Sequence, residues 1–127
     1  MDARTKKLEA NSFGNLAEEL VSREYVRRGY AVLERNWRLG RIEIDIIVRK
    51  DAIVALVEVK ARKTDEEDAL TAVNQDKRKR MIKAADVYLR RLKGDVNYRF
   101  DIATCVGTPE NNYIEIYEDA FLATDIF

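Results

Sequence analysis

The chain has 127 residues, of which 46% are hydrophobic and 36% charged, and its 23 basic side chains balance 23 acidic ones. This composition is typical of one folded domain and excludes extended disorder, while no apolar run approaches the ~20 residues that a membrane-spanning helix needs. The absence of histidine and the single cysteine exclude imidazole catalysis, most zinc sites and an internal disulfide.

In chain order, the hydrophobic patterns predict the elements αβββαββ. Residues 12–28 form an expected first helix, with Ser12 as N-cap and Gly29 closing it. A strand at 30–33, ending near 35–38, precedes strands at 41–49 and 53–61, a helix at 74–92, strands at about 97–106 and 112–118, and a terminal turn at 118–122. The order predicts a single α/β domain over residues 1–127, with a mixed central sheet flanked by helices.

The second and third predicted strands carry charges inside the most hydrophobic part of the chain. Glu43 and Asp45 alternate with isoleucines in the first, and Glu58 and Lys60 flank Val59 in the second. Side chains alternate along a strand, so each pair is expected to share a face. Buried charge is costly unless it is paired, hydrogen-bonded or bound to a metal, so these residues are candidates for function.

The residue types suit phosphodiester hydrolysis with a hard cation. Asp45 and Glu58 on neighbouring strands, together with the Val59 carbonyl, are candidate ligands for Mg²⁺, which prefers oxygen ligands and retains waters. Lys60 is positioned to orient a water or stabilise the attacked phosphate, and Lys77 faces the same way from the second helix. Glu43 is a candidate supporting or second-metal carboxylate. A partly buried ion-pair network explains the same spacing equally well.

The neutral net charge hides an uneven distribution. Residues 1–93 carry 22 basic and 16 acidic side chains, whereas residues 94–127 carry 1 and 7. Such a basic face suits phosphates, although solvated helix faces explain it too. The candidate nucleic-acid contacts are Arg62, Lys63, Arg78, Lys79 and Arg80.

Six segments in order resemble the bacterial YraN family, also called UPF0102. They lie between about residues 13 and 122 and include Glu43-Ile44-Asp45, Val57-Glu58-Val59-Lys60-Ala61-Arg62 and Arg99-Phe100-Asp101-Ile102. That family looks like a branch of the PD-(D/E)XK nucleases, near archaeal Holliday junction resolvases. The resemblance implies a restriction-endonuclease-like fold and a divalent-metal site.

The resemblance also implies roles for individual residues. The superfamily's two acids fall on Asp45 and Glu58 and its lysine on Lys60, while a further residue falls on Lys77 or, one place later, on Arg78. A carboxylate on the first helix is usual, and Glu18, Glu19 and Glu24 compete for it; helical geometry favours Glu18, which borders the apolar stripe.

Two kinds of function follow from these expectations. The first is a Mg²⁺- or Mn²⁺-dependent endonuclease acting on double-stranded or branched DNA in repair or recombination; the second is a non-catalytic DNA-binding or protein-interaction module that keeps the fold. Resolvase-like relatives suggest a homodimer. The lone cysteine and the lack of a signal peptide or membrane span favour the cytoplasm.

Overall fold

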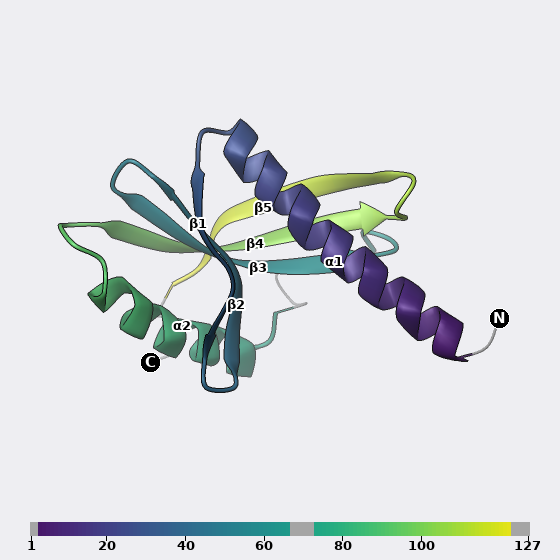
Figure 1. Ribbon diagram of the computed structural model, residues 1–127, viewed down its shortest axis with the longest axis horizontal. Coiled ribbons are helices and arrows are strands. Elements are labelled where there is room, and N and C mark those ends of the chain that lie inside the picture. Colours follow the sequence, from purple (N-terminus) through teal and green to yellow (C-terminus); the bar gives the residue numbers. More distant parts are fainter. Residues whose placement is uncertain (1–2, 67–72, 123–127) are drawn as a thin grey trace.

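The computed structural model describes residues 3–66 and 73–122. Within them the predicted order αβββαββ is confirmed (Figure 1). The elements are α1 (Ala3–Arg27), β1 (Ala31–Leu39), β2 (Ile42–Lys50), β3 (Ile53–Arg62), α2 (Gln75–Arg90), β4 (Asn97–Gly107) and β5 (Asn112–Phe121).

The five strands form one mixed sheet in the order β1-β2-β3-β4-β5. Only β3 and β4 run parallel, and α2 lies in the connection between them; the other neighbours are antiparallel. This is the mixed α/β architecture expected from the sequence, and it is consistent with a restriction-endonuclease-like fold. Neither described helix is long and apolar enough to cross a membrane.

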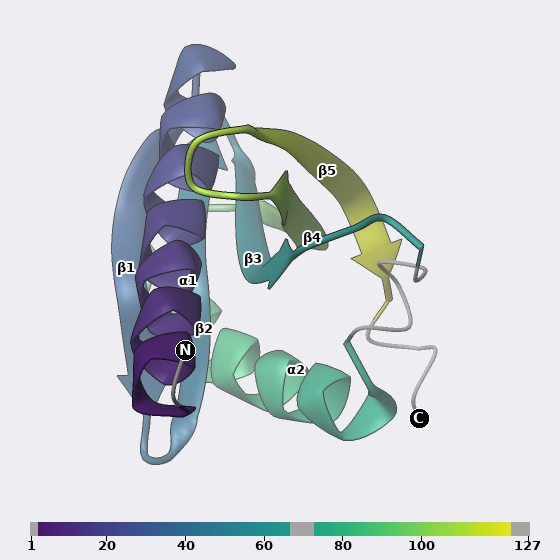
Figure 2. The same cartoon turned by 90° about the vertical axis from the view of Figure 1, so that its right-hand side faces the viewer.

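The two helices cover opposite faces of the sheet (Figures 1 and 2). Val21 and Tyr25 of α1 pack on one face, against side chains such as Ile46 and Val57. Met81 and Tyr88 of α2 pack on the other face, in a second hydrophobic core. That core includes Ile44, Ile47, Val54, Leu56, Phe100 and Ile102. The apolar residues that recur along the helices and strands are therefore buried between each helix and the sheet.

Side-chain alternation in β2 breaks near its charged segment. Ile44 and Ile47 pack in the α2 core, whereas Ile46 and Val48 pack in the α1 core. Strict alternation would place Ile44 and Ile46 on the same face. Alternation is therefore interrupted between Ile44 and Ile46, next to Asp45, while Glu43 and Asp45 both remain close enough to Glu18 for their charges to raise its pKa.

A buried polar network joins α1 to the strands β4 and β5. Asp101 on β4 is fully buried and accepts hydrogen bonds from the Tyr25 hydroxyl (2.8 Å), the Arg99 guanidinium (2.9 Å) and the Asp119 backbone N–H (3.0 Å). Arg99 also donates to the Tyr30 hydroxyl at 2.7 Å. Side chains of α1 and β4 and a backbone N–H of β5 thus donate to one carboxylate, which fixes the position of α1 over the sheet.

The start of the first helix was predicted too late. The helix α1 begins at Ala3, so Ser12 lies inside it and is not its N-cap. The preceding segment contains Ala3, Lys6, Lys7, Leu8 and Ala10, all good helix formers, which let the helix extend beyond its amphipathic part. Gly29, with φ of +95°, ends the helix as predicted.

The terminal turn predicted at 118–122 was also wrong. The strand β5 continues to Phe121, which pairs with Phe100, and the register shifts between Phe100 and Ile102. Asp119 lies at this irregularity with φ of +53°, a conformation that aspartate tolerates better than most residues. The irregularity absorbs the turn-forming residues without ending the strand. The polar segment 62–69, which the sequence places in a loop between the strand at 53–61 and the helix at 74–92, lies partly outside the described residues.

Candidate active site

A polar cavity of about 560 Å³ lies between α1, the strands β2 and β3, and the first turn of α2. Most of the residues proposed from the sequence as catalytic or metal-binding line it. Its lining is Gly14, Asn15, Glu18, Asp45, Glu58, Val59, Lys60, Ala61 and Lys77. Segments far apart in the sequence therefore meet at one place, as both a metal site and a partly buried ion-pair network require.

The cavity begins where β2 and β3 separate. Their last paired residues are Ile46 and Val57, so the regular ladder stops just before Asp45 and Glu58. Beyond that point, the Asp45 Oδ2 atom accepts a hydrogen bond from the Val59 backbone N–H at 2.8 Å. The Asp45 carboxylate thus replaces the backbone carbonyl that would accept this bond in a regular ladder. Because the pairing ends at Ile46 and Val57, Asp45 and Glu58 both lie where the two strands separate.

Glu58 is the most deeply buried acid of the cavity, with 2% of its side chain exposed. Its Oε1 atom lies 2.5 Å from Lys77 Nζ and 3.8 Å from Lys60 Nζ. Its Oε2 atom is buried and has no hydrogen-bond partner among the described residues. A buried carboxylate oxygen without a donor is costly, so half of this carboxylate is unsatisfied by the protein alone.

Burial, together with the nearby Asp45 charge, raises the pKa of Glu58 from 4.5 to about 7, against the opposing effect of Lys77 and Lys60. Burial acts to lower the pKa of Lys77, but its hydrogen bond to Glu58 and the charges of Glu58, Asp45 and Glu43 outweigh burial, so that pKa is raised. Lys77 therefore remains protonated, and Glu58 carries an easily displaced proton near neutral pH.

The structure resolves which acid of α1 faces the cavity. Glu18 lines it, and both burial and the charge of Asp45 raise the Glu18 pKa. Glu19 instead pairs with Arg23 and Arg35, each at 3.1 Å. Glu24 pairs with Arg27 at 2.6 Å and Arg28 at 3.0 Å. The prediction that favoured Glu18 over these two alternatives therefore agrees with the placement of the three side chains.

Asn36 on β1 is a site residue that the sequence analysis did not assign. With its amide nitrogen turned toward the carboxylates, it donates to Glu18 Oε2 at 3.1 Å and to Glu43 Oε1 at 2.7 Å. Its backbone is left-handed, with φ of +53°, although it lies within a strand. Asparagine is one of the few residues that tolerate this conformation. An asparagine within a predicted strand segment was therefore the one sequence signal that could have indicated an irregular backbone here.

Glu43 lies beside the cavity and is not part of its lining. Its second carboxylate oxygen lies 3.6 Å from Arg38, and its side chain is about one-third exposed (34%). Through Asn36 it is linked to Glu18, and its charge contributes to raising the Glu18 pKa. This placement matches a supporting position more closely than direct contact with a cation beside Glu58.

The five predicted nucleic-acid contacts occupy different surroundings. Lys63, Lys79 and Arg80 are exposed. Arg62 is half-buried and lies with Lys63 around a small hollow at the end of β3. Arg78 donates to the Val73 carbonyl at 2.9 Å and lies over the Phe121 ring at 5.2 Å, so its guanidinium is directed toward the protein.

The donor set of the cavity fits a hard divalent cation. Carboxylate oxygens of Asp45 and Glu58 and the carbonyl of Val59 are the kind of oxygen ligands that Mg²⁺ and Mn²⁺ accept, and Glu58 Oε2 has no hydrogen-bond partner among the described residues. Within the described residues, no three acidic or cysteine side chains converge into a ready-made ligand group. Mg²⁺ needs only one or two carboxylates because it retains waters.

Most of the residues that line this cavity lie in the part of the chain that matches a known protein family. Residues 17–105 match the family described as "Uncharacterised protein family UPF0102". The chain is similar to a UPF0102 protein of Phocaeicola vulgatus, 38% identical over 117 residues that cover 89% of this chain and 94% of the relative. It is also similar to a UPF0102 protein of Chloroherpeton thalassium, 38% identical over 120 residues, covering 91% and 93%. The matched region contains Glu18, Asp45, Glu58, Lys60 and Lys77.

Proposed function

This chain belongs to the UPF0102 family, and from that premise and the polar cavity we propose that it is a divalent-metal-dependent endonuclease that hydrolyses phosphodiester bonds in DNA. The observation that carries the proposal is that Glu58 lies near Asp45 and contacts Lys60 and Lys77 through Oε1, whereas its Oε2 is buried and has no hydrogen-bond partner among the described residues. A structural ion-pair network would satisfy both oxygens of its central carboxylate.

Each lining residue has a distinct role in this proposal. Asp45, Glu58 and the Val59 carbonyl would hold Mg²⁺ or Mn²⁺, with Glu18 close enough to influence their charge. When bound, the cation supplies an activated water and stabilises negative charge on the phosphate. Lys60 faces the same cavity and offers an ammonium group to orient the water or the phosphate.

Lys77 acts mainly through Glu58. Its ammonium lies 2.5 Å from Glu58 Oε1, which restrains the carboxylate, while Oε2 is left without a hydrogen-bond partner among the described residues. It also compensates part of the cost of a buried negative charge. Lys77 is therefore a positioning residue, whereas Lys60 is the candidate for contact with the phosphate.

The surroundings of the cavity favour a nucleic acid as the substrate. The exposed side chains of Lys63, at the end of β3, and of Lys79 and Arg80, on α2, lie close in sequence to the lining residues Lys60 and Lys77. Positive charges on either side of an acidic site attract the phosphates that flank a scissile bond. This arrangement suits a polyanionic substrate better than a small neutral molecule.

The test is cleavage of a panel of linear, flapped and four-way DNA substrates in Mn²⁺, with EDTA as the metal-free control. Asp45→Asn and Glu58→Gln should each lower the cleavage rate by at least about 100-fold, since each removes a charged cation ligand while conserving shape. Glu19→Gln is a matched control because this glutamate lies outside the cavity. Equal cleavage by wild type, Asp45→Asn and Glu58→Gln would refute the proposal.

A second candidate function is a DNA-binding module without catalysis. The close pairing of Glu58 with Lys77 favours it, because a lysine already neutralises the carboxylate that a cation would need. This candidate predicts salt-dependent DNA binding without turnover in any divalent metal. Binding by wild type, together with no cleavage of the whole panel in Mg²⁺ or Mn²⁺, would favour it over the endonuclease.

A further inference from the structure

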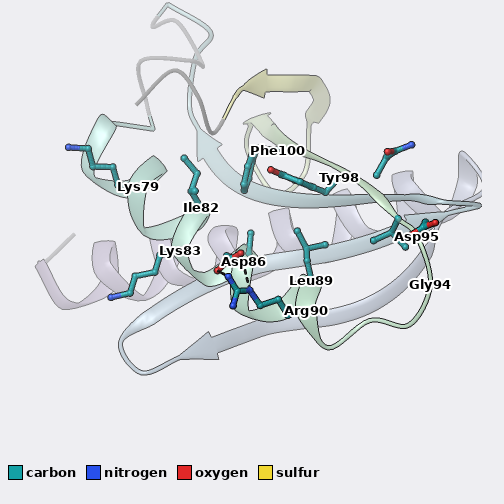
Figure 3. Close-up of a pocket in the computed structure, with 13 residues that line it drawn as sticks. Lys79, Ile82, Lys83, Asp86, Leu89, Arg90, Gly94, Asp95, Tyr98 and Phe100 are labelled. Carbon is teal, nitrogen blue, oxygen red and sulfur yellow. Dashed lines mark hydrogen bonds and ion pairs between the residues drawn. The ribbon is translucent and has the colours of Figure 1, made fainter. Parts of the chain in front are cut away.

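A second hollow, distinct from the polar cavity, lies between α2 and the start of β4 (Figure 3). Its volume is about 1060 Å³. We call it the α2–β4 groove, and the lining residues that matter here are Lys79, Ile82, Lys83, Leu89, Tyr98 and Phe100. Ile82 and Leu89 from the helix and Phe100 from the strand form an apolar floor.

Tyr98 provides a supported, exposed aromatic surface in this groove. Its ring lies edge-to-face on Phe100, with centroids 5.8 Å apart, and Phe100 in turn stacks on Phe121 at 4.8 Å. Phe100 and Phe121 are buried, whereas Tyr98 is 49% exposed. A ring held from below and open on its other side is the kind of platform on which an unpaired base stacks.

The charges of the groove are arranged in a gradient along α2. Lys79 and Lys83 are separated by about one helical turn and lie at the end nearer the start of the helix (Figure 3). Farther along, Asp86 is paired with Arg90 at 3.1 Å, so these two charges offset each other. Asp95 lies at the opposite end, after the helix. Phosphates are therefore attracted to the Lys79–Lys83 end.

That basic end and the candidate active site both lie along the first turns of α2. Lys77, which lines the polar cavity, precedes Lys79 by only two residues on the same helix. From Lys79 to Arg90 the helix advances about 16 Å at its usual rise, which gives the groove room for a few nucleotides. A strand that leaves the cavity over the first turn of α2 would reach the lysines first and the aromatic platform afterwards.

We propose that the α2–β4 groove binds an unpaired strand of DNA next to the scissile position, with bases on Tyr98 and phosphates on Lys79 and Lys83. The inference rests on the proposed function and narrows its substrate class to DNA with a single-stranded segment, such as a flap or a fork. A fully paired duplex could not present its bases to this groove, because they are stacked within the helix.

The test measures equilibrium binding in EDTA, so that cleavage plays no part. Fluorescence anisotropy compares a blunt duplex, the same duplex with a single-stranded tail, and a duplex whose tail has abasic sites. Wild type should bind the tailed duplex about tenfold more tightly than the blunt one, and the abasic tail should lose most of that gain. Equal affinity for tailed and blunt duplexes would overturn the inference.

Matched variants separate stacking and charge from folding. Tyr98→Ser should remove most of the tail preference while leaving the affinity for blunt duplex unchanged, and Tyr98→Phe should restore it. Tyr113→Ser is the control, since Tyr113 is similarly exposed (46%) but lies on β5, outside the groove. Lys83→Ala should weaken binding of the tailed duplex more than Lys93→Ala, an exposed lysine outside the groove lining.

Photo-crosslinking gives a direct second readout. A bromouracil placed in the tail should crosslink to Tyr98 or its neighbours in the groove, and a crosslink confined to other surfaces would contradict the proposal. Tail preference without Mn²⁺-dependent cleavage would support the groove and refute the nuclease. Mn²⁺-dependent cleavage without tail preference would support the nuclease and refute the groove. The absence of all DNA binding would refute both proposals.

Discussion

At the scale of single residues, Glu58 is held where ionisation is unfavourable, with only 2% of its side chain exposed and Asp45 beside it. These two effects outweigh Lys77 and Lys60, and the Glu58 pKa rises from its ordinary 4.5 to about 7. Residues that destabilise a fold in this way are common at sites where function needs the charge. Glu58 on β3 lines the cavity, and Asn36 on β1 holds Glu18 and Glu43 beside it.

Glu58 should make the metal-free protein less stable as pH rises. Below about pH 4.5 the carboxyl is protonated in both states, and between 4.5 and 7 only the folded state keeps the proton. The free energy of unfolding therefore falls over this range, by roughly 3 kcal/mol in total from this group. Glu58→Gln should remove that dependence, as measured by urea unfolding at pH 4, 5.5 and 8 in EDTA. Parallel pH curves for wild type and variant would contradict this account.

Two substitutions of Asn36 should distinguish the effect of its backbone conformation on stability from the effect of its side chain. Its left-handed backbone, with φ of +53°, is strained for alanine but not for glycine, and both substitutions remove the amide that binds Glu18 and Glu43. Asn36→Ala should therefore be less stable than Asn36→Gly by about 1 kcal/mol. Urea unfolding of the two variants measures the difference. Equal stabilities would show that the backbone at this position is not restrained.

At the scale of elements, the site depends on how α1 is attached to the sheet. Glu18 reaches the cavity from the middle of this helix, while Tyr25, two turns later, donates to the buried Asp101 on β4. Asp101 also accepts from Arg99 and from the Asp119 backbone, so one carboxylate joins α1, β4 and β5. The contact lies away from the cavity, yet it sets the position of the helix that supplies Glu18.

Removing this attachment should be strongly destabilising. Asp101→Ala should lower the free energy of unfolding by about 3–5 kcal/mol, because Arg99, with 14% of its side chain exposed, loses its buried partner. Tyr25→Phe should cost only about 1–2 kcal/mol, since the other donors to Asp101 remain. Chemical denaturation measures both changes, and amide exchange should show α1 opening more readily in Tyr25→Phe. A loss below 1 kcal/mol in Asp101→Ala would show that the network is not a principal support.

At the scale of the whole molecule, a neutral chain carries an uneven charge. The basic excess lies in residues 1–93 and the acidic excess in residues 94–127. The exposed Lys63 follows the cavity residue Lys60 on the chain, and the exposed Arg80 follows Lys77. The protein can therefore present a positive surface to phosphates without a positive net charge, because binding responds to the local field.

DNA affinity should accordingly fall with salt. The logarithm of the binding constant should decrease linearly with the logarithm of salt concentration, and neutralising one contacting cation should reduce the slope by about 1. Lys63→Ala and Arg80→Ala should each do so, whereas Lys93→Ala, beyond the last turn of α2, should leave the slope unchanged. Anisotropy titrations at several salt concentrations measure the slopes. Identical slopes for all three variants would place the DNA on another surface.

The amino-acid sequence by itself determined the element order, the apolar faces and the acids Asp45 and Glu58 as candidates. These features depend on local periodicity and on residue type, both of which can be read along the chain. Helical geometry also favoured Glu18 over Glu19 and Glu24 for the first-helix carboxylate that the family resemblance implies, but it left all three as candidates. The sequence did not locate the start of α1 or the end of β5, because helix propensity and strand pairing extend elements beyond their hydrophobic patterns.

Only the tertiary structure decided how these residues meet. Separation of β2 from β3 places Asp45 and Glu58 at one opening, and Asn36, whose backbone is left-handed, donates to both Glu18 and Glu43. The α2–β4 groove likewise combines residues from a helix and a strand that no linear pattern relates. The physical reason is that burial, partners and pKa depend on distances across the sheet, whereas the sequence specifies only which groups are available.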